Sequence, residues 1–193
     1  MQTRNSSGLD QFCASLEERP GMNILDLAGA NQGTISFVTN YGHGIYSDDL
    51  LMQMDECFGE RDFFENQINP RKVDEFLARA LHFPNDHFDG ALLWDALQYL
   101  APPLLTVVID RLWHMLRPGG CMLALFNASD SVELVQSYSY RIADHRTIGM
   151  HPRGMRKPSQ PFNNRTLEKI FQNFNSVKFF LARDHLREVI VRR

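Results

Sequence analysis

The hydrophobic positions of this 193-residue chain follow two alternating spacings over its first 127 residues. Short apolar runs predict strands, and segments with apolar residues three or four positions apart predict helices. The predicted strands are residues 23–27, 44–47, 88–94 and 121–126. The predicted helices are residues 33–41, 50–64, 71–81 and 104–116. Strands that alternate with helices are typical of an α/β fold built on a parallel sheet.

The pattern changes beyond residue 127. Residues 132–146 can be interpreted as a helix or as a strand, and the alternation of Tyr138, Tyr140 and Ile142 favours a strand. Residues 147–161 have no periodicity and are rich in Gly, Pro, Arg and Lys, so they predict a loop. A helix capped by Asn163 is predicted at residues 163–174. Two strands, 177–182 and 188–191, are predicted to follow it, joined by a turn at 183–186.

A further helix precedes the first strand, because apolar residues recur at helical spacing from Leu9 to Leu16 and Pro20-Gly21 end the segment. We expect this helix to pack on the sheet edge or to cover the ligand cleft. The length suits one core, so a single domain, 1–193, is predicted. Within it, residues 1–21 form an N-terminal helical extension and residues 128–162 a variable insertion or loop.

Composition points to an ordinary globular chain with 44% apolar and 22% charged residues. No apolar run reaches membrane-spanning length and Met1 to Ser7 are polar, so a cytoplasmic location is expected. The three cysteines, Cys13, Cys57 and Cys121, fit neither a zinc spacing nor a disulfide framework and are expected to be buried or half-buried free thiols.

The net charge of −3 is unevenly distributed. Residues 141–193 carry 12 Lys and Arg against 4 Asp and Glu, whereas residues 1–140 carry 8 against 19. Two interpretations remain open: an anionic partner for the basic C-terminal part, or pairing of its basic residues with acidic elements of the same chain. The second is favoured.

Acidic residues follow the first two predicted strands. Residues 24–34 have the sequence ILDLAGANQGT, so Asp26 lies at the tip of the first strand, and Asp48 and Asp49 follow the second. In an open α/β sheet, ligands bind at the carboxyl ends of the strands. Small residues there let the backbone approach a ligand, and the next helix offers unpaired N–H groups. The sequence therefore predicts a ligand site at this edge.

This stretch resembles the opening of the class I S-adenosylmethionine-dependent methyltransferases, whose first strand ends in Asp/Glu-x-Gly-x-Gly-x-Gly. The matching frame in this chain begins at Asp26, and Ala28, Ala30 and Gln32 replace the three glycines. The glycine-rich motif is thus degenerate, and Gly29 and Gly33 lie one place off the frame. Alanine is still small and is unfavourable only where φ must be positive.

Two later segments extend the resemblance. Residues 81–100 (LHFPNDHFDGALLWDALQYL) are similar to the family's segment around its fourth strand, with Tyr99 where many relatives have His. Residues 116–120 (LRPGG) resemble the turn before its fifth strand. The family's third strand is poorly marked between residues 50 and 81, which leaves a short strand or a helical connection as alternatives.

The resemblance implies a doubly wound, mostly parallel sheet with helices on both faces and an antiparallel C-terminal strand, and S-adenosylmethionine as cofactor. It implies that Asp26 holds the methionyl amino group, directly or through water. It also implies that Asp49 accepts hydrogen bonds from both ribose hydroxyls, with Asp48 as a competitor for that role. The implied cofactor-binding residues are Asp26, Ala28, Gly29, Ala30, Asp49 and Trp94.

The end of the fourth predicted strand supplies candidates for the acceptor side of the site. Asp95 could orient the substrate or act as a base, and the alternative is that it caps the following helix. Tyr99 is a further candidate substrate contact. Trp94 is interpreted as a cleft wall that stacks against adenine or substrate.

Histidines and basic residues are candidates for a metal site, a general base or an anion site. His82 and His87 could form a metal pair, but a turn with two exposed histidines is favoured, and no metal site is predicted. His145 and His151 lack a carboxylate that would orient a general base. The basic residues Arg146, Arg153, Arg156 and Lys157 could form an anion site over the cleft, or a solvated loop, which is favoured.

The predicted function is S-adenosylmethionine-dependent methyl transfer to a small-molecule or protein acceptor that the residues do not identify. The alternative is a non-catalytic methyltransferase-like binding or scaffold protein, which the degenerate loop and the unmarked third strand support. A nucleotide-binding Gly-x-Gly-x-x-Gly after the first strand, a hydrolase Gly-x-Ser-x-Gly and a P-loop Gly-Lys-Ser/Thr are all absent, and no nucleic-acid module is visible.

Overall fold

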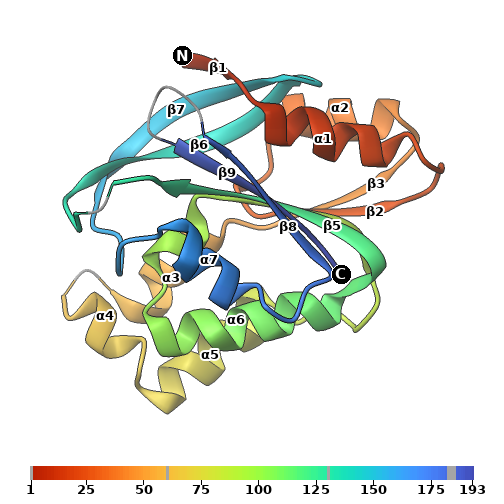
Figure 1. Ribbon diagram of the computed structural model, residues 1–193. Helices are drawn as coiled ribbons and strands as arrows, with labels where there is room; N and C mark the ends of the chain where they lie inside the picture. Colours follow the sequence, from red (N-terminus) through yellow and green to blue (C-terminus); the bar gives the residue numbers. More distant parts are fainter. Residues whose placement is uncertain (1, 60, 130, 182–185) are drawn as a thin grey trace.

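The computed structural model describes residues 2–59, 61–129, 131–181 and 186–193, and its centre is a six-stranded sheet (Figure 1). The strand order is β3-β2-β4-β5-β9-β8. The strands are β2 (Asn23–Asp26), β3 (Gly44–Ser47), β4 (Phe88–Trp94), β5 (Leu116–Asn127), β8 (Ser176–Leu181) and β9 (Leu186–Arg192). Strands β2 to β5 pair in parallel, and β9 is antiparallel to both β5 and β8.

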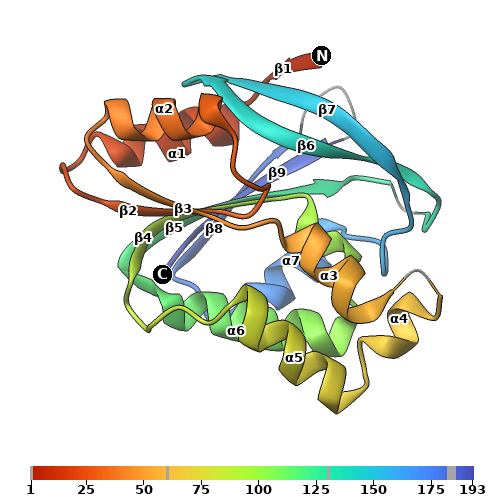
Figure 2. The ribbon, with the colours of Figure 1, turned by 180° about the vertical axis from the view of Figure 1, so that it is seen from behind.

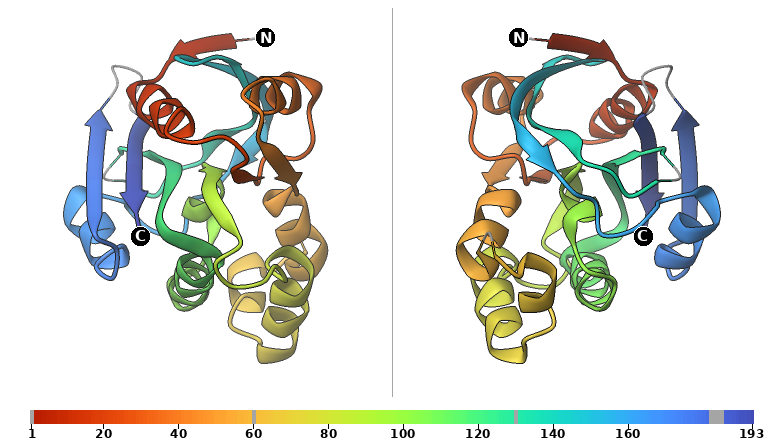
Figure 3. Two further views of the ribbon diagram at one scale, coloured as in Figure 1. Left: turned by 90° about the vertical axis from the view of Figure 1, so that its right-hand side faces the viewer. Right: turned by 90° about the vertical axis from the view of Figure 1, so that its left-hand side faces the viewer.

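Helices cover both faces of this sheet, as predicted. Two of them, α1 (Ser7–Leu16) and α2 (Gln32–Asn40), lie on one face. The opposite face carries α3 (Leu50–Phe58), α5 (Pro70–Ala80), α6 (Pro102–Met115) and α7 (Asn164–Ile170) (Figures 1 and 3). The central strand β4 is buried at all seven positions. Its residues alternate between two hydrophobic clusters, Leu93 toward α3 to α7 and Leu92 toward α1 and α2.

The sequence left two alternatives between residues 50 and 81, a short strand or a helical connection, and the helical connection is confirmed. Between β3 and β4 the chain forms α3, the short α4 (Phe63–Asn66) and α5, so β3 is the edge of the sheet. The helix predicted at residues 50–64 ends earlier, because Gly59 adopts a φ of 70° and breaks it after Phe58.

A second, three-stranded sheet lies beyond the carboxyl ends of the parallel strands (Figure 2). Strands β6 (Val135–Asp144) and β7 (Thr147–Arg156) form an antiparallel hairpin, and β1 (Gln2–Asn5) pairs with β7. The strand interpretation of residues 132–146 is thus confirmed.

The prediction of a loop at residues 147–161 is wrong for most of its length, because β7 occupies Thr147–Arg156. This strand has partners on both sides, β1 and β6, so ladder hydrogen bonds stabilise a segment whose Gly and Pro content disfavours a strand locally. Gly149 has a packing role, since an added Cβ would lie 2.8 Å from the Arg141 side chain on the paired strand.

The N-terminal helix α1 packs on the face of the sheet over β5, β8 and β9, not on its edge or over the cleft. Ser6 caps it by accepting a hydrogen bond of 2.9 Å from the Leu9 N–H. Close packing needs Gly90 on β4, where a Cβ would come within 2.9 Å of the Phe12 ring.

Most of the turn predicted at 183–186 lies outside the described residues. Among the helices described, none is long and apolar enough to cross a membrane.

Candidate functional site

Polar residues from three loops meet at the carboxyl ends of β2, β3 and β4, as the sequence predicts. The Asp48 N–H donates to the carbonyl oxygen of Asp26 at 2.9 Å, and the Gly29 N–H donates to that of Asp48 at 2.9 Å. The Trp94 indole Nε1 donates to Oδ1 of Asp26 at 2.7 Å. Asp26, Gly29, Asp48 and Trp94 are thus joined directly.

Asp26 is fully buried at the end of β2. Its Oδ1 accepts from Trp94 and, at 3.2 Å, from the Ala28 N–H, whereas its Oδ2 is buried without a hydrogen-bond partner among the described residues. Burial raises the pKa of this carboxyl to about 6, against the opposing effect of the two hydrogen bonds. A buried oxygen with unused acceptor capacity is costly unless a ligand uses it.

The loop after β2 explains how alanine can stand in the glycine frame. Gly29 has a φ of 86°, in the left-handed region that favours glycine. Ala28 and Ala30 are not among the described residues with a positive φ, so a side chain at those positions costs no backbone strain. An added Cβ at residue 29 would lie 3.3 Å from Oδ2 of Asp49, so glycine also keeps the space beside that carboxylate open.

Asp49 has two partners in this structure. Its Oδ1 caps α3 by accepting from the Met52 N–H at 3.0 Å. Arg153 of β7 donates from Nη1 to both oxygens, at 2.9 and 2.8 Å. Asp48 faces elsewhere, since its Oδ1 accepts from the Asp49 N–H at 2.8 Å and lies near Gln53. Release of Arg153 would therefore free acceptor capacity on Asp49.

Trp94 packs against the second sheet. Its ring is stacked on Tyr140 of β6, with centroids 5.1 Å apart and planes 1° from parallel. Its φ of 51° is rare for a bulky residue and persists only where surrounding contacts over-determine the conformation. The stack and the indole hydrogen bond to Asp26 are such contacts. Trp94 is 1% exposed, and Tyr140 stacks on its ring; its role as a cleft wall stays a prediction.

Asp95 is 2% exposed and lies at the start of the short 3₁₀ helix η1 (Ala96–Tyr99). It makes no side-chain cap, so the capping alternative is wrong; the Tyr99 hydroxyl donates to Oδ2 at 3.1 Å instead. Burial raises the pKa of Asp95 to about 7. The hydroxyls of Tyr99 and Tyr140 and the positive charge of Arg156 oppose this rise, although the Tyr140 hydroxyl does not reach full hydrogen-bond geometry. This carboxyl can therefore exchange a proton near neutral pH.

A cavity of about 210 Å³ adjoins Asp95 between the two sheets. Gln98 lines this cavity and connects β5 with η1. Its Oε1 accepts from the Asn127 N–H at 3.0 Å, and its Nε2 donates to the Tyr99 hydroxyl at 3.1 Å. Neither Gln98 nor the stacking of Tyr140 on Trp94 was predicted from the sequence. Alternation of apolar positions placed Tyr140 on a strand, but no local signal places it against Trp94 and Asp95.

The basic residues of the hairpin pair within the chain. Arg153 contacts Asp49, and Arg156 bonds with both Nη atoms to the Asp55 carboxylate, one of them at 2.8 Å. Arg146 lies 3.6 Å from Asp10. The prediction of a solvated loop is therefore wrong for Arg153 and Arg156, because β7 and their ion pairs order them, whereas Lys157 follows β7 and is exposed. No cluster of three metal-ligating side chains occurs in the described part of the chain.

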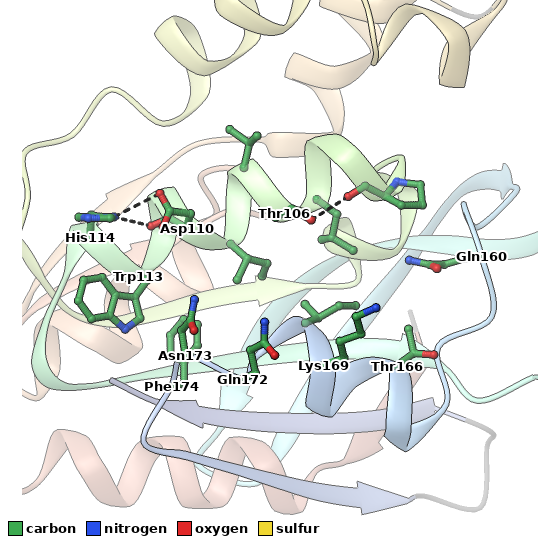
Figure 4. Close-up of a pocket in the computed structure, with 15 residues that line it drawn as sticks. Thr106, Asp110, Trp113, His114, Gln160, Thr166, Lys169, Gln172, Asn173 and Phe174 are labelled. Carbon is green, nitrogen blue, oxygen red and sulfur yellow. Dashed lines mark hydrogen bonds and ion pairs between the residues drawn. The ribbon is translucent and has the colours of Figure 1, made fainter.

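A larger cavity lies away from the strand ends, in a groove of about 980 Å³ between α6 and α7 (Figure 4). Trp113, His114, Lys169 and Asn173 are among the residues that line it. None of the site residues predicted from the sequence lines this groove. The larger cavity and the cluster of polar residues thus lie in different parts of the molecule, and the candidate site is the polar cluster at the strand ends.

The comparisons with known proteins concern the fold. No family model matches the sequence, and no curated protein matches it. Solved structures do match, and they show that this chain shares the fold of S-adenosylmethionine-dependent methyltransferases.

Three of these structures illustrate the likeness. A methyltransferase from Archaeoglobus fulgidus matches with a TM-score of 0.56 at 11% identity, covering 96% of this chain and 91% of its own. One from Methanosarcina mazei has a TM-score of 0.53 at 12% identity, with 94% and 96% covered. The 1,6-didemethyltoxoflavin-N1-methyltransferase of Burkholderia thailandensis, solved with S-adenosylhomocysteine, has a TM-score of 0.52 at 14% identity, with 97% and 78% covered.

Proposed function

We propose that this chain binds S-adenosylmethionine across the carboxyl ends of β2, β3 and β4 and transfers its methyl group to an acceptor. The observation that carries the proposal is the buried Oδ2 of Asp26, which has no hydrogen-bond partner among the described residues at the end of β2. A positively charged amino group is the partner that a buried carboxylate oxygen lacks. Gly29 lies against Asp49, whose two oxygens suit a pair of ribose hydroxyls.

The cofactor supplies an electrophilic methyl group on a sulfonium. The residues of this chain have to position the two reactants, since an in-line displacement depends on orientation more than on strong acids or bases. Asp26 would accept a hydrogen bond from the methionyl amino group at Oδ2, and Asp49 would hold the ribose. Asp95, with a pKa raised to about 7, can accept a proton at its carboxylate when the acceptor loses one.

Cofactor binding in this pose requires the β6–β7 hairpin to release Asp49. Nη1 of Arg153 occupies both carboxylate oxygens that the ribose would use. The side chains of Arg153 and Asp49 are 27% and 18% exposed, so the pair is solvated enough for exchange to be inexpensive. The hairpin would thus act as a cover over the cofactor.

One observation favours the rival function, a non-catalytic methyltransferase-like binding or scaffold protein. Arg153 and the Trp94–Tyr140 stack fill positions that a cofactor would contact, so the fold is internally satisfied there.

Titration calorimetry with S-adenosylmethionine and S-adenosylhomocysteine distinguishes the two functions. Binding predicts a heat signal and stabilisation of about 2.7 kcal/mol at a ligand concentration of 100 Kd. Absence of heat and of any thermal shift at millimolar ligand would establish the rival.

A further inference from the structure

A further cavity, of about 590 Å³, opens beside the candidate site. It lies between two elements that are near each other in Figures 1 and 2, α4 and the end of β7. We refer to it as the α4–β7 pocket. Its lining residues are Asp55, Gly59, Phe63, Phe64, Tyr99, Arg153, Gly154, Met155, Arg156 and Lys157. None of the roles discussed above uses Phe63 or Phe64.

One side of the α4–β7 pocket is aromatic. Phe63 and Phe64 are half-buried and pack edge to face, with ring centroids 5.3 Å apart. Tyr99 adds a third ring, and the Arg156 guanidinium lies over it at 5.9 Å from the centroid. Flat rings and a planar guanidinium are surfaces that favour a planar, apolar ligand group.

The other side of the pocket is basic. Three cations and one carboxylate line it, and Arg156 is held by that carboxylate, Asp55. Arg153 is held by Asp49, as described above. Lys157 is exposed and has no ion pair among the described residues. The lining therefore carries an unmatched positive charge, which favours a ligand with one negative charge.

The pocket also reaches the centre of the candidate site. Tyr99, which is fully buried, is among the lining residues, and its hydroxyl donates to Oδ2 of Asp95. A ligand in the pocket would thus lie one side chain from the group with a pKa of about 7. Arg153 connects the pocket in the same way to Asp49.

We propose that the α4–β7 pocket binds an aromatic carboxylate, and that the methyl acceptor of this chain belongs to that class. The second part rests on the proposed function. With a phenolic acceptor, an oxygen lone pair forms the bond to the methyl carbon while the carbon–sulfur pair stays on sulfur. The phenol proton passes to the Asp95 carboxylate and from there to solvent, and S-adenosylhomocysteine is the other product.

The test measures binding of 4-hydroxybenzoate by titration calorimetry to the full chain. Its neutral amide, 4-hydroxybenzamide, lacks the charge, and cyclohexanecarboxylate lacks the ring. We expect each to bind about fivefold more weakly, because a single ion pair or aromatic contact at a partly exposed site contributes about 1 kcal/mol. Equal binding of all three probes, or no binding of 4-hydroxybenzoate, would overturn the proposal.

Matched variants locate the site. Lys157→Gln and Phe64→Leu should each weaken 4-hydroxybenzoate binding by about threefold to tenfold. Lys169→Gln is the control, since Lys169 is also an exposed lysine on a cavity wall but belongs to the α6–α7 groove (Figure 4). An equal effect of Lys157→Gln and Lys169→Gln would mean that 4-hydroxybenzoate binds elsewhere.

Titration in the presence of S-adenosylhomocysteine separates this inference from the proposed function. An acceptor has to bind together with the cofactor, so saturating S-adenosylhomocysteine should leave 4-hydroxybenzoate binding intact or strengthen it. Displacement would refute the acceptor role. Binding of 4-hydroxybenzoate by a chain that ignores both cofactor forms would refute methyl transfer while the pocket stands. Cofactor binding without 4-hydroxybenzoate binding would refute the ligand proposed for the pocket and leave the proposed function intact.

Discussion

Asp26, Asp49 and Asp95 follow three neighbouring strands, but each carboxyl group has a different environment. Asp26 is buried with one unpartnered oxygen, and Asp95 is buried with a tyrosine hydroxyl as donor. Asp49 caps a helix and pairs with Arg153. Burial therefore raises the pKa of Asp26 and of Asp95, and the hydrogen bonds that each carboxyl accepts oppose this rise.

Asp49→Asn tests the ribose role without removing the cap of α3. Asparagine retains an oxygen that can accept from the Met52 N–H, whereas Asp49→Ala would also lose about 1 kcal/mol of capping. We expect Asp49→Asn to weaken S-adenosylmethionine binding by about tenfold to a hundredfold in calorimetry, because hydrogen bonds to a charged group contribute roughly 1.5–3 kcal/mol.

Asp48→Asn is the control for this prediction. Asp48 accepts from its own neighbour's N–H, so its substitution should leave cofactor affinity unchanged. Weaker binding by Asp48→Asn together with normal binding by Asp49→Asn would move the ribose contact by one residue. Normal binding by both variants, with real cofactor binding by the parent chain, would place the ligand away from the end of β3.

Asp95→Asn tests the raised pKa through the pH dependence of stability. The pKa rises from 3.8 to about 7 in the folded chain, so the native state binds more protons than the unfolded state across that interval. The contribution of Asp95 is fully present below pH 4 and is lost as pH rises through 7, with an upper limit of about 4 kcal/mol. Urea unfolding from pH 4 to 8 should therefore show a smaller decline for Asp95→Asn. Parallel curves would show that Asp95 titrates normally.

At the scale of elements, the β6–β7 hairpin lies against the strand ends of the candidate site. It contributes Tyr140 to the Trp94 stack and Arg153 to the Asp49 pair, and β6 also packs against α2. The site is thus built from strand ends on one side and from a separate sheet on the other. Ligand access depends on how tightly the second sheet is held.

Arg153→Gln should strengthen S-adenosylmethionine binding, because the ribose no longer competes with the guanidinium for Asp49. A partly exposed ion pair contributes up to about 1 kcal/mol, so we expect a gain of about threefold to fivefold in calorimetry. Arg156→Gln is the matched control, since Arg156 is a β7 arginine that pairs with Asp55 instead. If Arg153→Gln weakens binding, the arginine contacts the cofactor and does not compete with it.

At the scale of the whole molecule, charge pairing joins the basic C-terminal part to the acidic N-terminal part. Arg192 lies 3.8 Å from Glu18, and Arg193 pairs with Asp86. Arg146, Arg153 and Arg156, described above, likewise pair with acidic residues of the N-terminal part. The intramolecular interpretation of the uneven charge is therefore realised in the fold, and an anionic partner stays a prediction.

A buried ion pair also holds the two sheets together. Arg4 on β1 donates to Oε1 of Glu188 on β9 at 2.7 Å, and the Gly8 N–H donates to Oε2 at 2.5 Å. Only 8% of Arg4 and 1% of Glu188 are exposed. Removal of the arginine would leave a buried carboxylate with much less compensation.

Arg4→Met should lower the free energy of unfolding by about 3–5 kcal/mol in urea titrations, because the Glu188 charge stays buried without its ion-pair partner. Arg4→Met combined with Glu188→Gln should recover much of this loss, since the neutral amide can still accept from Gly8. A double variant as unstable as Arg4→Met would show that packing of the arginine, and not charge compensation, holds β1 in place.

The sequence by itself determined the parallel core of the fold and the edge that carries the acidic residues. Runs such as residues 88–94 are apolar enough to require burial on both faces, and Asp26 and Asp95 must then follow at the strand ends. These signals are local, because they depend on the spacing of neighbours along the chain. The same locality explains why the helix caps at Asn163 and Ser6 form where they do.

Only the tertiary structure decided how the site is closed. β7 is a strand because β1 and β6 pair with it from distant parts of the chain, and its own composition indicates a loop. The contacts of Arg153 with Asp49 and of Tyr140 with Trp94 join residues 104 and 46 positions apart, so no local pattern specifies them. Burial by that second sheet is also what raises the pKa of Asp95, since desolvation depends on all the atoms that pack around a group and not on its neighbours in sequence.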